Sequence, residues 1–159
     1  MQQRRLNTRG IVHRAGKILA VKLKDRDGNP VDYWCLPGGG VDDYESVDDA
    51  VKREFQEEIG VTPTINRIIL GQQYRTSREG FHEEIELFYL LEDSSEYDDI
   101  DLSKTSHGMQ EIHEVAFIDP KSENLLPKFL CEIDILSYIE EVKPLHIINN
   151  FEAPSTGRK

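Results

Sequence analysis

The segment from residue 39 to residue 61 constrains the fold of this chain most, because it contains a helix with both ends marked. Ser46 is a residue type that caps helix N-termini, and Asp49 follows three residues later, as in a capping box. Gly60 stands where a helix commonly ends in a left-handed residue. These signals predict a helix over residues 46–59.

Three glutamates of this helix fall on the side that should face the protein core. At about 100° per residue the apolar residues form one stripe, and Glu54, Glu57 and Glu58 share it. Carboxylates on a core-facing stripe repel one another and are costly to bury unless they are compensated. A divalent cation such as Mg²⁺ or Mn²⁺ would compensate them, and ion pairs with Arg53 or other cations are the alternative. The opposite face is predicted to be the solvent face and holds Asp49, Lys52, Arg53 and Gln56.

The rest of the chain has the pattern of strands and one more helix. Alternating apolar and polar residues predict a hairpin from residues 8–13 and 17–24, and a short strand at 33–36. Further strands are predicted at 64–73, 81–92 and 112–118, with an acidic, mobile loop at 92–106. Pro127 can open a last helix that runs to residue 142. This order predicts an α+β fold, an α/β/α sandwich with a mixed β-sheet and a C-terminal helix.

Length and charge limit the kind of protein further. The 159 residues suit one domain, expected at residues 1–145, followed by a flexible tail at 146–159 with disorder from residue 153. A net charge of −11 disfavours nucleic-acid binding, and no apolar run is long enough to span a membrane. Cys35 and Cys131 lack metal-ligand spacing and fit a reducing compartment. With no signal peptide in view, a cytoplasmic location is expected.

The same segment matches the Nudix box, in which glycines, glutamates and one arginine stand at fixed spacings. The pattern is G-x5-E-x7-R-E-U-x-E-E-x-G-U, where U is apolar, and Phe55 and Val61 fill the apolar positions next to the fixed residues. The chain therefore resembles Nudix hydrolases, with the fold likeness expected over about residues 5–142. The fixed positions are Gly39, Glu45, Arg53, Glu54, Glu57, Glu58 and Gly60.

The resemblance implies roles for residues of the box. Glu54, Glu57 and Glu58 correspond to the glutamates that hold Mg²⁺ or Mn²⁺, and the backbone carbonyl of Gly38 corresponds to a frequent further ligand. Glu54 also matches the position of the general base in some members. The implied chemistry is attack of water on one phosphorus of a diphosphate. The catalytic candidates are Glu54, Glu57 and Arg53, and the supporting ones are Gly39 and Glu45.

Candidates outside the box are less sharply indicated by the sequence. Family members often recruit another acid, for which Glu114 is the first candidate and Glu111 the second, ahead of the glutamates at 83, 84 and 86. Basic residues that could bind phosphates are Arg9, Lys22, Lys24, Arg75 and Arg78, and aromatic residues that could stack on a base are Tyr33, Trp34, Tyr74 and Phe81.

The resemblance implies an enzyme that hydrolyses a nucleoside diphosphate linked to another group. Nucleoside triphosphates, oxidised ones included, are the first candidates, because the sequence markers associated with ADP-ribose and coenzyme A hydrolases are absent. Dinucleoside polyphosphates, ADP-ribose and nucleotide sugars remain alternatives, as does a nucleotide-sensing module without catalysis. An acidic metal-buffering or interaction domain is a further alternative, and a homodimer is expected only because relatives are frequently dimers.

Overall fold

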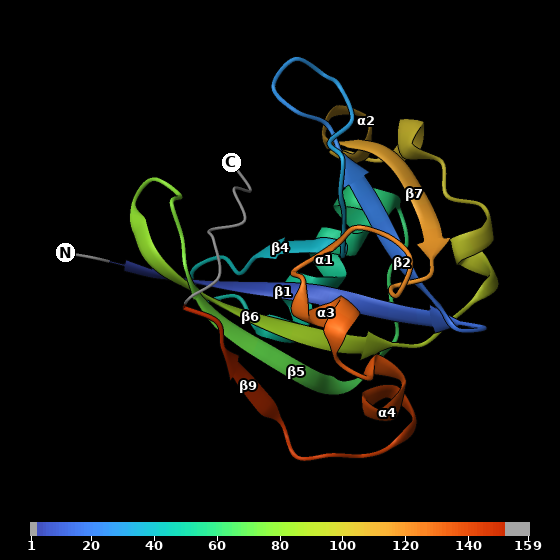
Figure 1. Cartoon of the computed structure of the whole chain (residues 1–159). Helices are drawn as coiled ribbons and strands as arrows, with labels where there is room; N and C mark the ends of the chain where they lie inside the picture. Colours follow the sequence, from blue (N-terminus) through green and yellow to red (C-terminus); the bar gives the residue numbers. More distant parts are fainter. Residues whose placement is uncertain (1–2, 152–159) are drawn as a thin grey trace.

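Nine strands form one mixed sheet in the computed structural model, which describes residues 3–151 (Figure 1). The sheet order is β8-β3-β2-β1-β6-β5-β9, with β4 paired to β1 and β7 paired to β2. The strands are β1 (Gln3–Arg14), β2 (Lys17–Leu23), β3 (Trp34–Cys35), β4 (Gly38–Gly40), β5 (Ile65–Arg75), β6 (Phe81–Leu91), β7 (Ile112–Ile118), β8 (Leu125–Leu126) and β9 (His146–Asn149). The helices are α1 (Val47–Ile59), α2 (Gly108–Glu111), α3 (Phe129–Glu132) and α4 (Ile135–Glu140), with 3-10 turns η1 (Ser95–Asp98) and η2 (Leu102–Lys104).

The long strand β1 joins the two halves of the sheet. Its end forms an antiparallel hairpin with β2, in which Arg14 pairs with Lys17. Its middle pairs antiparallel with β4, and most of its length runs parallel to β6. Strand β1 is therefore the element that brings the short β4 segment, the hairpin and the β5–β6 pair together.

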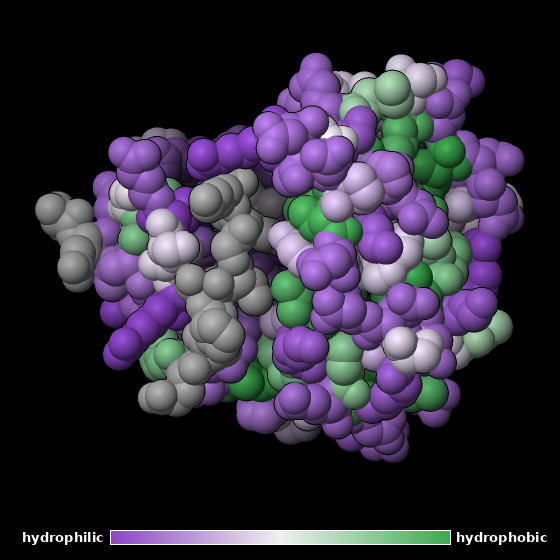
Figure 2. Space-filling view, turned by 45° about the horizontal axis from the view of Figure 1, so that its top comes forward, coloured by the Kyte–Doolittle hydropathy of each residue, from purple (hydrophilic) through white to green (hydrophobic). Residues whose placement is uncertain are grey.

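Helices cover both faces of the sheet, and each face has its own hydrophobic core. Phe55 and Ile59 of α1 pack with Tyr89 of β6 in one core. Leu130 of α3 and Ile135 of α4 pack with other buried residues in the second core. This arrangement confirms the predicted α+β sandwich. The face seen in Figure 2 is largely hydrophilic, with hydrophobic residues in separate groups, in agreement with the high content of charged residues.

The predicted central helix is confirmed, including both of its ends. The side chain of Ser46 accepts a hydrogen bond from the backbone N–H of Asp49 at 3.1 Å. Gly60 adopts a φ of 74°, the left-handed conformation that a glycine permits at a helix end. The hairpin and the strands expected from the alternating pattern are also present, with ends that shift by a few residues.

The single C-terminal helix predicted from residue 127 to residue 142 is wrong. Two short helices, α3 and α4, replace it, and the chain is extended at Ile133, where φ is −77° and ψ is 160°. The Lys121 ammonium donates to the carbonyls of Cys131 and Ile133, at 3.0 and 2.8 Å. These tertiary hydrogen bonds satisfy carbonyls next to the break, so a continuous helix is not needed to pair them.

Part of the segment expected to be a tail belongs to the sheet. Residues His146–Asn149 form β9, which runs parallel to β5 in a register that pairs Leu70 with His146. The sheet therefore extends beyond the boundary expected at residue 145. The disorder expected from residue 153 onward lies outside the described residues. Within the loop at 92–106, Tyr97 is buried against the α1 core.

Candidate active site

A close approach of two backbones fixes the loop in front of α1. Gly38 has a φ of 136°, and a Cβ added to it would lie 2.1 Å from the carbonyl oxygen of Thr8 on β1. Only glycine fits this position. The backbone N–H of Gly38 donates to Oε2 of Glu58 at 2.9 Å. The β4 segment is thus held by β1 on one side and by the helix on the other.

The three glutamates of α1 differ in burial although they share one face. Glu58 is buried, whereas Glu54 and Glu57 are partly buried. Burial raises the pKa of Glu54, and the hydrogen bond and charge of Arg53 act against that rise. The carboxyl of Glu54 also lies against Gly39, where an added Cβ would come within 2.5 Å of Oε1. The sequence thus brings three carboxylates to one place, one of them with a raised affinity for protons.

Arg53 lies among these carboxylates and not on the solvent face that the helical pattern predicted. Its guanidinium donates to both carboxyl oxygens of Glu45, at 2.7 and 2.9 Å, and to the carbonyl of Gly40 at 2.9 Å. Its Nη1 donates to Glu54 at 3.0 Å and to Glu57 at 3.2 Å. The hydrogen bond from Arg53 is the main reason why the pKa of Glu45 is lowered. Arg53 therefore ties the loop, Glu45 and two glutamates together.

The carboxylates are of the chemical kind that binds a divalent cation, but their present arrangement is an ion-pair network. Among residues 3–151, no three Asp, Glu, His or Cys side chains are placed as a ready-made metal site. Nη1 of Arg53 lies between Glu54 and Glu57, and the N–H of Gly38 holds Glu58. A cation would fit this donor set if the glutamate side chains turned away from Arg53.

The carbonyl of Gly38, a further metal ligand by resemblance, accepts a hydrogen bond from Nη1 of Arg9. Arg9 is buried, and its Nε donates to Glu86 of β6 at 3.2 Å. The predicted phosphate-binding residue Arg9 therefore reaches the same loop as the glutamates. A positive charge is thus held directly against the carbonyl oxygen of Gly38.

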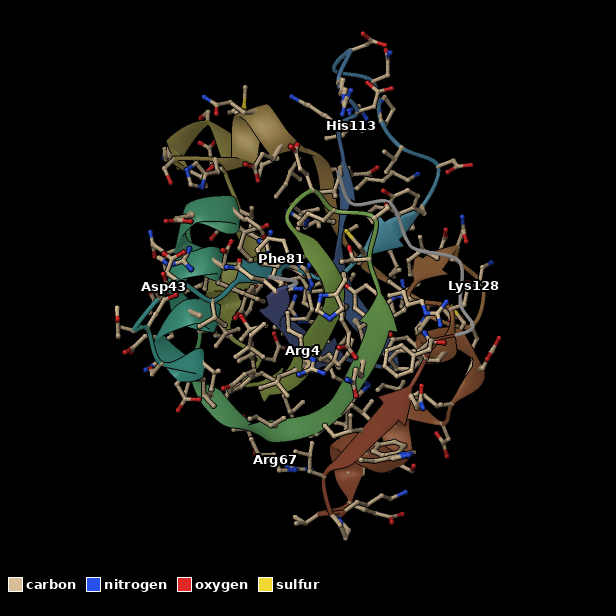
Figure 3. The ribbon with its side chains drawn as sticks, turned by 90° about the vertical axis from the view of Figure 1, so that its left-hand side faces the viewer. Arg4, Asp43, Arg67, Phe81, His113 and Lys128 are labelled. Carbon is tan, nitrogen blue, oxygen red and sulfur yellow. The ribbon has the colours of Figure 1, made fainter. Side chains whose placement is uncertain are left out.

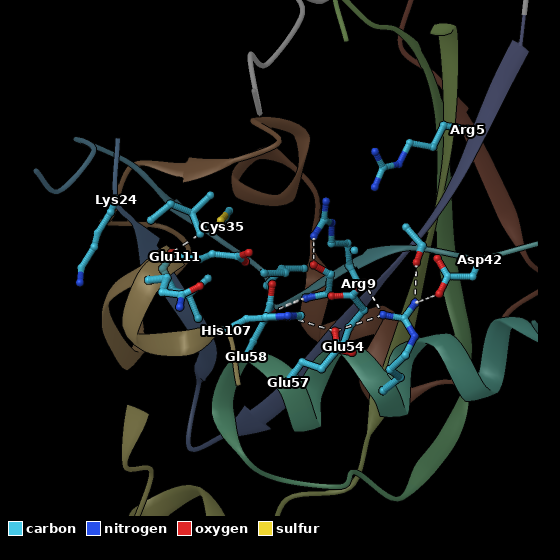
Figure 4. Close-up of a pocket in the computed structure, with 18 of the residues that line it drawn as sticks. Arg5, Arg9, Lys24, Cys35, Asp42, Glu54, Glu57, Glu58, His107 and Glu111 are labelled. Atoms are coloured by element: carbon cyan, nitrogen blue, oxygen red, sulfur yellow. Dashed lines mark hydrogen bonds and ion pairs between the residues drawn. The ribbon is translucent and has the colours of Figure 1, made fainter. Parts of the chain in front are cut away.

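A hollow of about 610 Å³, here called the first hollow, opens beside the end of α1 (Figure 4). Its walls come from β1, β2, β4, α1 and α2, so it lies where the two halves of the sheet meet. The charged residues that line it are Arg5, Arg9, Lys24, Asp42, Arg53, Glu54, Glu57, Glu58, Arg78 and Glu111, together with His107.

The structure separates the two acids proposed outside the box. Glu111 lines the first hollow from the end of α2. Glu114 lies on β7 opposite Lys22 and lines a different hollow with Arg14 and other residues. The geometry therefore favours Glu111 as a further acid and disfavours Glu114. The glutamates at 83, 84 and 86 are buried on β6 and hydrogen-bonded there.

The residues proposed to bind substrate are only partly brought together. Lys24 and Arg78 line the first hollow with Arg9, whereas the ammonium of Lys22 lies 4.9 Å from the ring centroid of Trp34. Trp34 is buried in the core, and the buried hydroxyl of Tyr74 donates to Glu84 at 2.9 Å, so neither ring is free to stack on a base. Tyr33 and Arg75 do not line the first hollow.

Sequence reasoning missed Arg5, His107 and Gln110, which all line the first hollow. Nδ1 of His107 lies 3.2 Å from Oε2 of Glu57, and its backbone N–H donates to the carbonyl of Glu57 at 3.0 Å. A period of two along β1, shared by Arg5 and Arg9, could have identified Arg5. No local pattern marks His107, because a loop distant in sequence brings it to the helix.

Comparison with known proteins agrees with this geometry. The family model of the NUDIX domain matches residues 3–132. The chain belongs to the Nudix family. Nudix enzymes are pyrophosphohydrolases that act on phosphoric anhydride bonds, and they generally use divalent metal cations. This assignment explains why the box residues, the β4 loop and the first hollow occur together.

Individual relatives support the family and the fold. The chain is 27% identical to the nucleoside triphosphatase NudI of Escherichia fergusonii over 116 residues, which is 70% of this chain and 79% of the relative. A MutT NUDIX hydrolase from Burkholderia pseudomallei has a TM-score of 0.63 at 22% identity, covering 82% of this chain and 98% of that one. An ADP-ribose pyrophosphatase from Streptococcus suis has a TM-score of 0.62 at 22% identity, covering 91% and 98%. No helix among the described residues is long and apolar enough to cross a membrane.

Proposed function

We propose that this Nudix enzyme hydrolyses nucleoside triphosphates, oxidised ones included. The products are a nucleoside monophosphate and inorganic diphosphate. The observation that carries the proposal is the first hollow, which is lined by three glutamates of α1 together with Arg9, Lys24 and Arg78. Carboxylates that can hold a metal ion and cations that can bind phosphate, in one hollow, suit a metal-bound polyphosphate. The likeness to a relative named as a nucleoside triphosphatase supports the same substrate class.

The proposed cofactor is Mg²⁺ or Mn²⁺. Glu54, Glu57, Glu58 and the carbonyl of Gly38 would hold it, with Gly39 leaving room for the carboxyl of Glu54. When bound, the cation lowers the pKa of a water molecule and neutralises phosphate oxygens. Release from Glu54 and Glu57 would then leave Nη1 of Arg53 available to the substrate, while Glu45 and the Gly40 carbonyl hold the rest of the guanidinium.

The catalytic roles follow from the positions of the side chains. Glu54 is proposed as the general base, since burial already raises the pKa of its carboxyl. Glu57 shares the metal, and before a cation binds Arg53 holds both glutamates in place through its hydrogen bonds. Glu45 is a positioning residue that fixes the guanidinium of Arg53. Glu111 is the further acid that lines the same hollow.

A small nucleotide is the proposed partner, without nucleic acid, because the net charge of −11 repels a polyanion surface. The proposed location is the cytoplasm, and the proposed assembly is a homodimer. Sedimentation of the purified chain measures the assembly directly.

A substrate panel and one substitution test the proposed reaction. We expect Mg²⁺- or Mn²⁺-dependent release of a monophosphate from nucleoside triphosphates, in preference to ADP-ribose, dinucleoside polyphosphates and nucleotide sugars. Glu57→Gln should lower kcat by on the order of 100-fold or more, since it removes a charged oxygen ligand. Glu96→Gln, at an exposed position outside the hollow, is the matched control. Full turnover by Glu57→Gln would overturn the metal assignment.

A further inference from the structure

A second hollow, of about 800 Å³, adjoins the first. Arg5, Gly40, Asp42 and Glu54 line both hollows, so the two meet beside the carboxyl of Glu54. Figure 3 looks onto this end of the molecule, where the labelled Phe81 and Arg4 lie near the centre of the view and Asp43 lies to one side. A substrate whose reacting phosphorus lies at the glutamates can therefore extend into a hollow on either side.

Arg5, at the boundary between the hollows, differs from the other arginines of the site. Arg9 and Arg53 each donate to a glutamate at 3.2 Å or less, whereas Arg5 has no carboxylate partner within 4.0 Å among residues 3–151. Its Nε donates only to the neutral Oδ1 of Asn7, at 2.9 Å. Burial, and then the nearby charge of Arg78, lower the pKa of Arg5. A partly buried guanidinium in this setting favours an anionic ligand.

The two hollows differ in charge, and this difference determines which end of a nucleotide each hollow suits. Five Lys or Arg residues and five Asp or Glu residues line the first hollow. Two arginines and three carboxylates line the second, and one of those arginines, Arg4, is paired with Glu83 at 2.5 Å. Apart from Arg5 at the boundary, the second hollow offers, among residues 3–151, no cation without a carboxylate partner, whereas the first hollow also holds Lys24, whose ammonium donates to the carbonyl of Met109. The terminal phosphates of a nucleotide therefore fit the first hollow better.

The second hollow contains an aromatic ring instead. Phe81 lines it from the start of β6, and the guanidinium carbon of Arg5 lies 5.9 Å from the centre of its ring. The ring is only partly buried, unlike those of Trp34 and Tyr74. A partly exposed ring with a cation beside it is a suitable surface for stacking of a nucleobase.

We propose that the second hollow is the nucleoside subsite, in which Phe81 stacks on the base and Arg5 binds the phosphate nearest the nucleoside. The terminal phosphates then lie in the first hollow with Arg9, Lys24 and Arg78. This assignment rests on the proposed hydrolysis of nucleoside triphosphates and adds the direction in which the nucleotide is bound.

Binding measurements separate this proposal from the hydrolysis itself. The α,β-methylene analogues of ATP and dTTP, which resist hydrolysis, and inorganic tripolyphosphate, which lacks a base, are titrated calorimetrically into the full chain with Mg²⁺. Phe81→Ala should weaken binding of the preferred nucleotide analogue by about 10-fold and that of tripolyphosphate by less than about 2-fold, because only the nucleotide stacks. Phe81→Tyr keeps the ring and should retain the affinity. Arg5→Gln should weaken binding of both ligands by about 10-fold or more.

Arg26→Gln is the charge-matched control, because Arg26 is exposed in the turn after β2 and lines neither hollow. The proposal is overturned if Phe81→Ala leaves nucleotide binding unchanged, or if it weakens both ligands equally. It is also overturned if Arg5→Gln has no larger effect than Arg26→Gln, or if the wild-type chain binds neither analogue. Because no turnover is measured, a protein that binds in the expected way without hydrolysis would contradict only the proposed function.

Discussion

At the scale of single residues, Glu84 shows how a buried carboxylate is kept charged beside the site. It is only 3% exposed, and it accepts hydrogen bonds from Tyr74 at 2.9 Å, from Thr76 at 2.6 Å and from Asn7. Burial acts to raise the pKa of Glu84, but these hydrogen bonds and the nearby charge of Arg78 together outweigh it, and the pKa is lowered. The charged form is therefore the one that the folded protein stabilises.

We therefore predict that Glu84→Gln destabilises the protein near neutral pH but not in acid. A lowered pKa contributes stability above the unfolded-state value of about 4.3, and this contribution is lost as the pH falls through the folded-state pKa. The variant should be less stable by about 1–3 kcal/mol at pH 7, since hydrogen bonds to a charged group are lost. Urea unfolding of the wild-type chain and of Glu84→Gln, from neutral to acid pH, measures the difference in their free energy of unfolding. A difference that stays constant with pH would contradict the assignment, and Glu96→Gln is the exposed control.

The residues of the site were predictable where one helix determines them. The helical period places Glu54, Glu57 and Glu58 on one face, and the structure brings all three to the first hollow. The prediction that Arg53 lies on the solvent face was wrong, because a helical wheel gives the direction of the Cα–Cβ bond and not the position of the end of a long side chain. Its position is set by Glu45, a residue of the preceding loop that the helical wheel does not include.

At the scale of elements, the packing of α1 on the sheet depends on one glycine. A Cβ added to Gly10 of β1 would lie 2.4 Å from the ring of Phe55 and 2.5 Å from Leu91. Phe55 is fully buried, in the turn of α1 that also carries Glu54. The absence of a side chain at Gly10 therefore sets how closely the helix approaches β1.

We predict that Gly10→Ala destabilises the protein by about 1–3 kcal/mol, because the added methyl group overpacks the contact with Phe55. The smaller side chain in Phe55→Leu should relieve part of this strain. The double variant should then be more stable than the sum of the two single effects implies. Chemical unfolding of the four proteins gives this coupling directly. Strictly additive effects would show that the two residues do not limit the approach of the helix.

The sequence predicted the elements whose ends are marked by residues next to them. It did not predict those that depend on contacts with residues distant in sequence. The cap at Ser46 and the stop at Gly60 lie within the helix they delimit. The break between α3 and α4 depends on Lys121, which precedes both helices and donates to carbonyls next to the break. An apolar repeat over residues 127–142 cannot reveal that interaction.

At the scale of the whole molecule, the sheet is completed by a strand that the sequence did not indicate. Strand β9 pairs parallel with β5, from Leu70 opposite His146 to Gln73 opposite Asn149. Ile147 contacts Gly71 closely enough that a Cβ there would lie 2.5 Å from its Cδ1. Ile148 packs against the core that α3 and α4 cover. Four residues are too few to show a strand period, so only the pairing with β5 defines β9.

Removal of this strand should therefore weaken the whole domain. A chain that ends at residue 145 loses the hydrogen bonds with β5 and the partial burial of Ile148, which together contribute about 1.5–3 kcal/mol. We expect its Tm to fall by about 3–12 °C, measured by calorimetry. A chain that ends at residue 151 keeps β9 and is the matched control. Equal Tm values for the two truncated chains would show that β9 adds nothing to the sheet, as a boundary at residue 145 implies. A lower Tm only for the shorter chain would place that boundary beyond β9.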